Sequence, residues 1–417
     1  MNALTCSTLP KLTSQVNDFH RAEPSPRCEH SEHHGESQPL GIYMANNAAK
    51  LSRNTRYSLR MRAGKILSNL TKTIIDSSTG ELKQVPSHRT TRCTCAIHDH
   101  ADLTYFFKSD MSTSGHQFKG LISCGSVWSC PVCSHKVAQF RSDEVTKAHD
   151  LMFSQGYKAY LITFTMSHKK TSDLSKLVDA LNHAFSRTII HRTFKTSFPD
   201  FEYVKAQECT YPFNSTTLAN KNGFHPHIHL LAFSRSKYSP DFLKSVIFPI
   251  YNDYLNKSGF NSSYKRGLDV KDSFSNAEYL TKFGYSAESW RSGAEMALSI
   301  YKDGHPFTLI DVHPNAFLEY SKVYKGKRQI TCSKGIRAMY PEFLKKDDAE
   351  IAQMESPDIF NQLVARFPKP FWNWLRSNQC QDDLIYYANL SRNTGYDLLN
   401  SYLENKKNIF NSSTSFI

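Results

Sequence analysis

The sequence predicts an α+β protein whose central feature is an antiparallel sheet covered by helices. The first observation is the segment Gly223 to Leu231, in which imidazoles alternate with apolar side chains as in a strand with one buried face. The second is a β-branched and aromatic run at 159–166, and the third is an apolar repeat at helical spacing between Leu174 and Ile189. Helices that connect strands able to pair antiparallel predict one covered face and a site on the other.

Each further element has its own signal. Apolar alternation predicts a strand at Phe201 to Thr210, and a polar stretch at 134–153 is expected to be helical. Ser172 is the expected N-cap of the helix that follows it. Another helix is predicted from Pro240 to about Lys257, with a kink at Pro249, because an internal proline removes a hydrogen bond.

Composition and charge limit the class of protein. The 417 residues, 40% of them hydrophobic and 12% aromatic, can bury at least one substantial core and predict two or three units. A formal net charge of +13 favours a polyanionic partner, with nucleic acid the first candidate. No stretch approaches the roughly 20 apolar residues that span a bilayer, and the first residues do not resemble a secretory signal. We therefore expect a cytoplasmic protein with no membrane partner.

Shifts in composition divide the chain into five regions. The first is too polar to build a core and is expected to be disordered. The second interleaves arginines with apolar residues and is expected to form a basic helix, which either contacts DNA or presents a solvated charged face. The last is expected to be helical, with Phe371, Trp372 and Trp374 in its core. The regions are 1–45 (tail), 46–88 (basic helical segment), 89–153 (cysteine-rich module), 154–340 (domain of the histidine strand) and 341–417 (helical C-terminal region).

The cysteines indicate a second kind of site. Half of the ten lie between residues 93 and 133, and in a cytoplasmic chain such cysteines are metal ligands or buried thiols rather than disulfides. Cys130 and Cys133 have the spacing of a zinc knuckle, and we expect Cys95 and Cys124 to complete a structural Zn²⁺ site that orders a DNA-binding module. Reduced core thiols are the alternative. Other donors compete for the open positions: Cys93, His98, His100, His116 and His135.

The histidine strand predicts a divalent-metal site. His227 and His229 are two residues apart and therefore point to the same face of a strand. Glu208 is the expected third ligand, because a neighbouring strand brings a side chain within about 5 Å across the ladder. Two imidazoles and a carboxylate suit Mn²⁺ and tolerate Mg²⁺. His225 precedes a proline at the start of the strand and is expected beside the ligands rather than among them.

A short predicted helix that ends at Gly284 carries a possible nucleophile. Tyr279 and Lys282 are three residues apart and share a face of that helix. A phenol with a pKa near 10 is a poor nucleophile, but an adjacent ammonium favours its anion. A phosphotyrosine intermediate is one interpretation; taken alone, Tyr279 is one of 21 tyrosines.

Three segments, taken in order, resemble the three motifs of plasmid rolling-circle replication initiators, the Rep branch of the HUH endonucleases. They are 161–165, 225–230 and 279–284. Four further stretches are similar to that family, so that the resemblance runs from about Cys124 to Arg337: 124–133, 317–320, 325–329 and 333–337. The resemblance implies a ferredoxin-like or RRM-like sheet that carries the histidines and a helix that presents the tyrosine.

The resemblance also implies an activity. Tyr279 would attack one phosphodiester at the double-strand origin, giving a 5′-phosphotyrosyl link and a 3′-OH primer. His227, His229 and Glu208 would hold the cation, and Lys282 would bind the phosphate or lower the pKa of the tyrosine. The implied partners are plasmid origin DNA, single-stranded and duplex, with host helicase and DNA polymerase, in a bacterial cytoplasm.

The sequence departs from the family at one point and leaves two other functions open. Some relatives carry a glutamate one helical turn before the nucleophile, where this chain has Ser275. Termination therefore stays unassigned between Glu278, Tyr285 and another group. The alternatives are a transposase with the same nicking chemistry and a DNA-binding repressor without enzymatic activity.

Overall fold

The computed structural model describes residues 53–108, 114–212, 222–272, 307, 309–355 and 359–414. The predicted tail and the tyrosine motif at 279–284 lie outside the described residues. No helix within the described ranges combines the length and apolar character needed to cross a bilayer.

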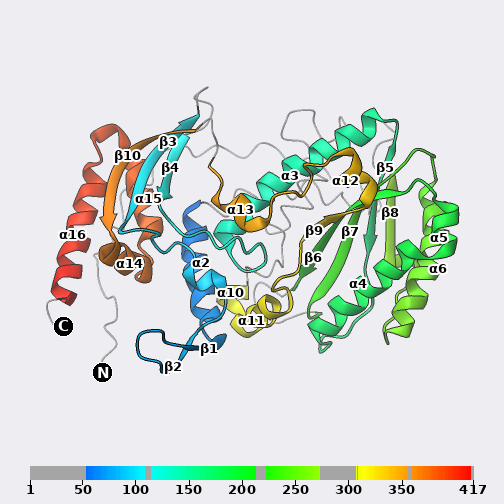
Figure 1. The fold of residues 1–417 in the computed structure, drawn as a ribbon, viewed down its shortest axis with the longest axis horizontal. Coiled ribbons are helices and arrows are strands. Elements are labelled where there is room, and N and C mark those ends of the chain that lie inside the picture. Colours follow the sequence, from blue (N-terminus) through cyan, green and yellow to red (C-terminus); the bar gives the residue numbers. More distant parts are fainter. Residues whose placement is uncertain are drawn as a thin grey trace, which may run out of the picture. The chain divides into compact units, whose positions relative to one another are not determined.

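A five-stranded antiparallel sheet forms the centre of the domain predicted at 154–340 (Figure 1). The strand order is β8-β5-β7-β6-β9, and every neighbouring pair is antiparallel. The α+β class with a central antiparallel sheet is thereby confirmed. The strands are β5 (Lys158–Phe164), β6 (Glu202–Thr210), β7 (His225–Ser234), β8 (Leu268–Asp272) and β9 (Ile330–Cys332).

One face of this sheet is covered by helices α4 (Leu174–Ile190) and α6 (Pro240–Lys257), with the short α5 (Arg192–Ser197) beside them. Ile228 and Leu230 of β7 point into this core and are fully buried. The N-cap of α4 is Asp173, whose carboxylate accepts from the Lys176 N–H at 2.9 Å, and not the neighbouring Ser172 that the sequence suggested. The hydroxyl of Ser172 instead accepts from the Lys169 N–H.

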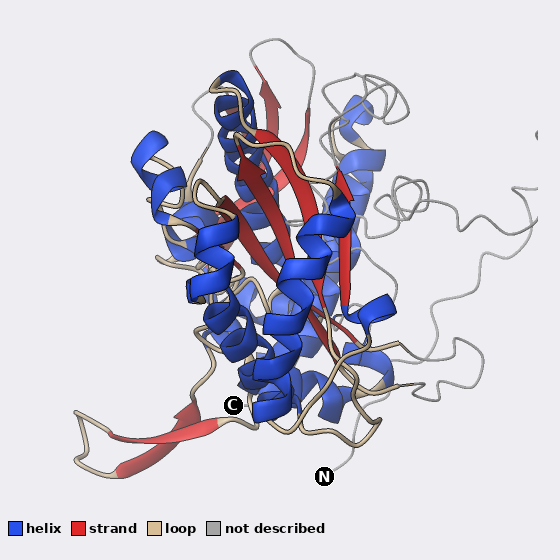
Figure 2. Ribbon diagram, turned by 90° about the vertical axis from the view of Figure 1, so that its right-hand side faces the viewer, coloured by secondary structure: helices blue, strands red, loops and turns tan. Residues whose placement is uncertain are grey.

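Within the described residues, the opposite face is covered in part, by helix α3 (Pro131–Ser154) and by side chains such as Ile336 and Phe343. Leu231 and Phe233 of β7 pack against Val145 and Met152 of this helix. Towards the start of β7, the same face carries His229 and then His227. Both histidines are only partly buried. Figure 2 shows helices on both sides of the strands. Among the described residues, the end of this face that carries the two histidines therefore stays partly exposed.

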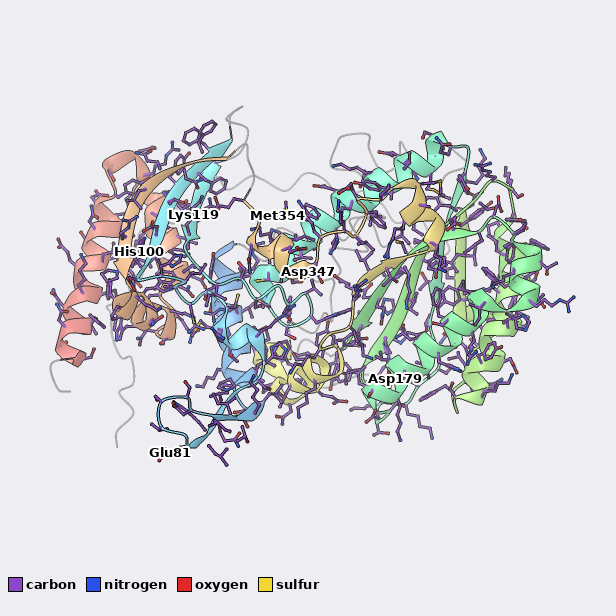
Figure 3. All side chains as sticks on the ribbon, viewed as in Figure 1. Glu81, His100, Lys119, Asp179, Asp347 and Met354 are labelled. Atoms are coloured by element: carbon purple, nitrogen blue, oxygen red, sulfur yellow. The ribbon has the colours of Figure 1, made fainter. Side chains whose placement is uncertain are left out.

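A second, three-stranded sheet joins two distant parts of the sequence. Its order is β10-β3-β4, with β3 (His100–Lys108), β4 (Ser114–Lys119) and β10 (Ile359–Pro368). Figure 3 labels His100 and Lys119 on this sheet. The C-terminal region is helical as expected in α14 (Lys369–Ser377), α15 (Gln381–Leu390) and α16 (Asp397–Thr414), yet it also supplies strand β10 to the cysteine-rich module.

The predicted basic helix is α2 (Arg53–Leu67), and it is shorter than the sequence pattern suggested because residues 71–75 form a strand. That strand, β1 (Thr71–Ile75), pairs with β2 (Leu82–Pro86) in an exposed hairpin. Helix α2 itself packs on α15, on α3 and on the 3-10 turn η1, which spans Arg89–Arg92. The remaining elements are α7 (Tyr264–Gly267), α10 (Leu309–Val312), α11 (Pro314–Val323), α12 (Lys334–Met339), α13 (Asp348–Gln353) and η4 (Arg392–Thr394).

A close backbone approach at Gly125 gives a test of this packing. Gly125 has φ +60°, and a Cβ atom there would lie 2.5 Å from the Cα of Ala349 at the start of α13. Gly156, which follows α3 with φ +81°, has open space around it. We expect Gly156→Ala to lower the free energy of unfolding by about 1–2 kcal/mol through left-handed strain alone. Gly125→Ala should lower the free energy of unfolding by about 1–3 kcal/mol more than Gly156→Ala does, because the added methyl group collides with the backbone.

Urea denaturation of the two variants measures the difference. Equal losses of stability in the two variants would contradict the close packing of the start of α13 on Gly125.

Candidate functional site

The pairing of β6 with β7 brings the three predicted ligands together. The register places Glu208 directly opposite His227. One carboxylate oxygen of Glu208, Oε2, lies 3.1 Å from Nε2 of His227 and 2.9 Å from Nε2 of His229. The Glu208 side chain is only 3% exposed, against 11% for His227 and 18% for His229. A buried carboxylate thus lies behind two imidazoles that reach the surface.

The second nitrogen of each ring is held by a neighbour. Nδ1 of His227 lies 3.1 Å from the carbonyl oxygen of His225, and Nδ1 of His229 lies 3.1 Å from Oγ1 of Thr163 on β5. A carbonyl oxygen only accepts, so the Nδ1 atom of His227 carries the hydrogen, and Nε2 of the neutral ring presents a lone pair. These contacts fix the ring orientations that a metal ligand requires.

A cation fits this donor set. A lone pair on Nε2 and a carboxylate oxygen at 3.1 Å repel one another unless a proton or a metal ion lies between them. Protonating both rings would place two positive charges beside one carboxylate, whereas a single divalent ion satisfies all three groups. The candidate ligand atoms of Glu208, His227 and His229 all lie within 4.8 Å of one another. Such a mixed nitrogen and oxygen set suits Mn²⁺ or a related ion.

His225 extends the row of imidazoles, and sequence reasoning did not find its partner. Nδ1 of His225 lies 2.9 Å from Nε2 of His168, in the loop after β5. Burial, with the neighbouring His227 and His168, lowers the pKa of His225 to about 4, so this ring is neutral at physiological pH. Nothing in the spacing of His168 marks it, because the loop that brings it here has no periodic pattern.

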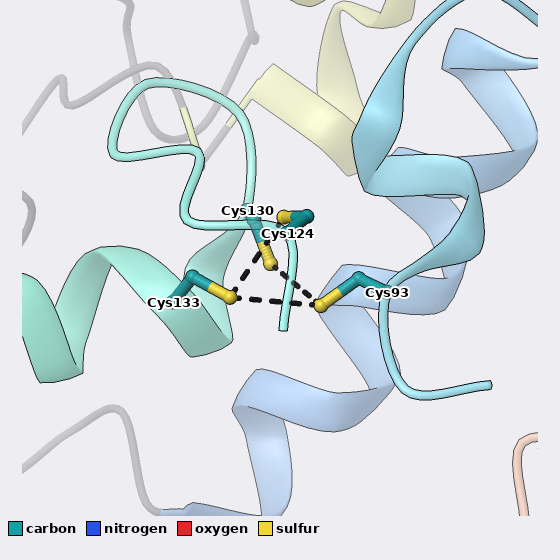
Figure 4. Close-up of side chains that lie close together, drawn as sticks. All are labelled: Cys93, Cys124, Cys130 and Cys133. Carbon is teal, nitrogen blue, oxygen red and sulfur yellow. Dashed lines mark hydrogen bonds between the residues drawn. The ribbon is translucent and has the colours of Figure 1, made fainter. Parts of the chain in front are cut away.

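Four cysteines form a second candidate metal centre (Figure 4). They are Cys93, Cys124, Cys130 and Cys133, all buried, with their sulfur atoms within 4.8 Å of one another. Hydrogen bonds from the Cys130, Cys133 and Cys93 thiols hold the pKa of the Cys124 thiol well below its usual range. Four convergent sulfur atoms are the donor set typical of structural zinc sites.

The fourth cysteine of this group is Cys93 and not Cys95, the residue predicted from the sequence. Cys93 ends the 3-10 turn η1, and its N–H bonds to the Thr90 carbonyl. Thr94 then adopts a left-handed conformation with φ 62°, and Cys95 pairs through its carbonyl with the Ile122 N–H. Helix α14 secures this turn, because the indole N–H of Trp372 donates to the Thr94 carbonyl at 2.9 Å.

A buried arginine lies beside the sulfur atoms. Arg60 of α2 is 0% exposed, and within the described part of the chain its Nε and Nη1 atoms have no hydrogen-bond partner. Burial lowers the pKa of Arg60, while the nearby Cys93 and Cys130 act in the opposite direction. Four thiolates around a divalent ion carry a net charge of about −2, which a buried guanidinium offsets. The Arg60 N–H groups that lack a described partner are therefore more consistent with four metal-bound thiolates than with four neutral thiols.

This placement also changes the interpretation of the basic helix. Arg60 faces the protein interior, and Arg62 pairs with Asp311 at 2.7 Å. Arg60 is therefore not available to DNA or solvent, whereas the partly exposed ion pair of Arg62 is consistent with a solvated face.

Comparisons with known proteins identify a family and two curated relatives. Residues 121–375, more than half of the chain, match the model of a family described as replication protein. A protein named Protein rep from Streptomyces lividans is 31% identical over 138 residues, covering 27% of this chain and 29% of that protein. A neomycin resistance protein from Streptomyces cyanogenus is 47% identical over 62 residues, 15% of this chain and 14% of that protein. The chain thus spans less than a third of the length of these curated relatives, and no solved structure matches it.

The choice between the two neighbouring cysteines can be tested by metal content. We expect the purified chain and its Cys95→Ser variant to carry the same number of tightly held metal equivalents, measured by plasma mass spectrometry. Cys93→Ser should lose this metal, because removing one of four thiolates opens the site. Retention of metal by Cys93→Ser together with its loss from Cys95→Ser would contradict the observed geometry.

Proposed function

This chain belongs to the replication protein family whose model it matches, and on that premise we propose that it initiates plasmid replication by nicking one strand of the origin. The observation that carries the proposal is the grouping of Glu208, His227 and His229 on the partly uncovered face of the five-stranded sheet. The net charge of +13 supports a nucleic-acid substrate. The origin would be bound both as duplex and as single strand.

In the proposed reaction Tyr279 is the nucleophile. Its phenolate oxygen forms a bond to the phosphorus of one phosphodiester, and the bond from phosphorus to the 3′-oxygen breaks. The DNA 5′-phosphate is then joined to the tyrosine, and the 3′-oxygen takes up a proton to become the 3′-OH primer. Lys282, three residues on, would bind the phosphate or stabilise the phenolate.

Glu208, His227 and His229 would hold a divalent cation, Mn²⁺ or Mg²⁺. When bound, such an ion polarises the scissile phosphate as a Lewis acid. The protein's own contribution is rigidity: the His225 carbonyl and the Thr163 hydroxyl keep the two rings aimed at the same point. Positioning of this kind supplies much of the catalysis in phosphoryl transfer.

The cysteine centre is proposed to be a structural zinc site formed by Cys93, Cys124, Cys130 and Cys133. It would order the start of α3, which goes on to cover the sheet. The site is closed and buried, so we assign it no chemistry. Host helicase and DNA polymerase would act on the nicked origin, in a bacterial cytoplasm.

The nucleophile can be tested by trapping the covalent product. Incubated with Mn²⁺ and single-stranded DNA from the origin region, the protein should form a tyrosine-linked oligonucleotide that is detectable by mass spectrometry. Tyr279→Phe should abolish the adduct, because phenylalanine has no attacking oxygen. Tyr386→Phe, at an exposed position of α15, is the matched control and should still form it. An adduct formed by Tyr279→Phe would contradict the assignment of Tyr279 as the nucleophile. If the unmodified chain forms no adduct, the result would favour a DNA-binding repressor.

The role of the histidines can be separated from folding. We expect His227→Ala to reduce cleavage by at least about 100-fold, since a lost ligand removes the cation that polarises the phosphate. Binding of single-stranded DNA should be largely retained. His98→Ala changes an exposed histidine away from the site and should cleave normally. Parallel loss of binding and cleavage in His227→Ala would point to a structural role instead.

A further inference from the structure

A basic cavity outside the histidine site is left unexplained by the proposed reaction. Its volume is about 510 Å³, and it is lined by segments 87–89, 126–128, 324–330 and 344–349, together with side chains of α3. Seven lysines and arginines line it, against two aspartates. A cavity of this size and charge is suited to an anionic ligand.

Both aspartates are already engaged. Asp347, labelled in Figure 3, caps helix α13 by accepting from the N–H groups of Ala349 and Glu350, each at 2.8 Å. Asp348 forms a 2.9 Å ion pair with Arg141, which also pairs with Glu144. The acidic groups of the lining therefore do not neutralise its remaining cations.

Two of those cations have no counter-ion within the described ranges. The side chains of Lys325 and Arg328 are exposed, and neither forms an ion pair with a described carboxylate. Lys327, between them, lies 3.4 Å from the well-exposed Asp179 of α4. Exposed cations on a cavity rim, without partners, are available to phosphate oxygens.

The loop that carries these cations is built into the fold. The indole N–H of Trp128 donates to the Lys327 carbonyl at 2.7 Å, and its ring stacks on Tyr324 with centroids 4.3 Å apart. The backbone N–H of Gln207 on β6 donates to the Gln329 carbonyl at 2.8 Å. Trp128 and Tyr324 are 5% and 1% exposed, so neither ring offers a free surface for a base. The cavity therefore suits phosphate groups rather than stacked bases.

The same loop leads directly to the metal ligands. After Gln329 the chain enters β9, whose Ile330 pairs with Ala206 of β6. Glu208 lies two residues further along β6, a distance of about 7 Å in an extended strand. The loop that carries Lys325 and Arg328 therefore leads into the strand that pairs with β6, close in sequence along β6 to the carboxylate.

From these observations we propose that the cavity binds the phosphate backbone of the DNA strand that the histidine site cleaves. The proposal rests on the nicking function above and deepens it by assigning a place where the substrate strand is held. Lys325 and Arg328 make the phosphate contacts. They position the strand and take no part in the chemical step.

The test is the salt dependence of binding by Lys325→Gln/Arg328→Gln. Fluorescence anisotropy with a labelled 20-nucleotide single strand, between 50 and 300 mM KCl and without added divalent ions, gives the slope of log Kd against log salt. Two lost phosphate contacts should reduce this slope by about 1.4, since each contact to a single strand contributes about 0.7. Lys325→Gln alone should reduce it by about 0.7.

The matched control is Arg192→Gln/Lys195→Gln, which removes the same charge from two exposed positions of α5. It should keep the slope of the unmodified chain. An unchanged slope in Lys325→Gln/Arg328→Gln, or an equal reduction in the control, would overturn the proposal. So would ATP binding that the cavity variant weakens while its DNA slope stays normal, because the cavity would then hold a free nucleotide.

The binding measurement is independent of cleavage. A reduced slope in a chain that never forms the tyrosine adduct would support the cavity and remove the nickase. Normal adduct formation together with an unchanged slope in the cavity variant would support the nickase and overturn the cavity as the DNA-binding site.

Discussion

The antiparallel register of β6 and β7 is the constraint on which the rest of the structure depends. It sets a buried carboxylate, Glu208, between the Nε2 atoms of two imidazoles. A slip of one residue would turn Glu208 to the face packed by α4 and α6 and would separate it from the histidines. The apolar partners of β7 on both faces make such a slip costly, because Ile228 and Leu230 fill one core while Leu231 and Phe233 fill another.

Helix α3 links this sheet to the cysteine centre. Its first turn contains Cys133, Cys130 caps it, and its later turns cover the far end of the histidine face. Arg376 of α14 holds the opposite side of the same centre by donating to the carbonyl of Thr91 at 2.7 Å. A metal bound by the four sulfur atoms would therefore stiffen both the helix that packs on the sheet and the C-terminal helices.

The sequence was most informative where a local pattern decided the geometry. Alternation along β7 and the proximity of β6 were enough to predict that Glu208 would meet His227 and His229. The choice between Cys93 and Cys95 was not open to such reasoning, because both fit the spacing. The left-handed turn at Thr94 and a contact from Trp372, more than 270 residues away, decide it. Strand β10 was missed for a similar reason, since its partner β3 is distant in sequence. The tyrosine motif stays a prediction.

The most direct test of the account is to identify the atoms that bind the divalent ion. Pulsed electron paramagnetic resonance of the chain loaded with one equivalent of Mn²⁺ reports nitrogen nuclei bound to the metal. Two imidazole nitrogen couplings are expected, with one lost in a His229→Gln variant. Bound Mn²⁺ with no nitrogen coupling, or with couplings that the variant leaves unchanged, would contradict the claim that these two strands form the metal site.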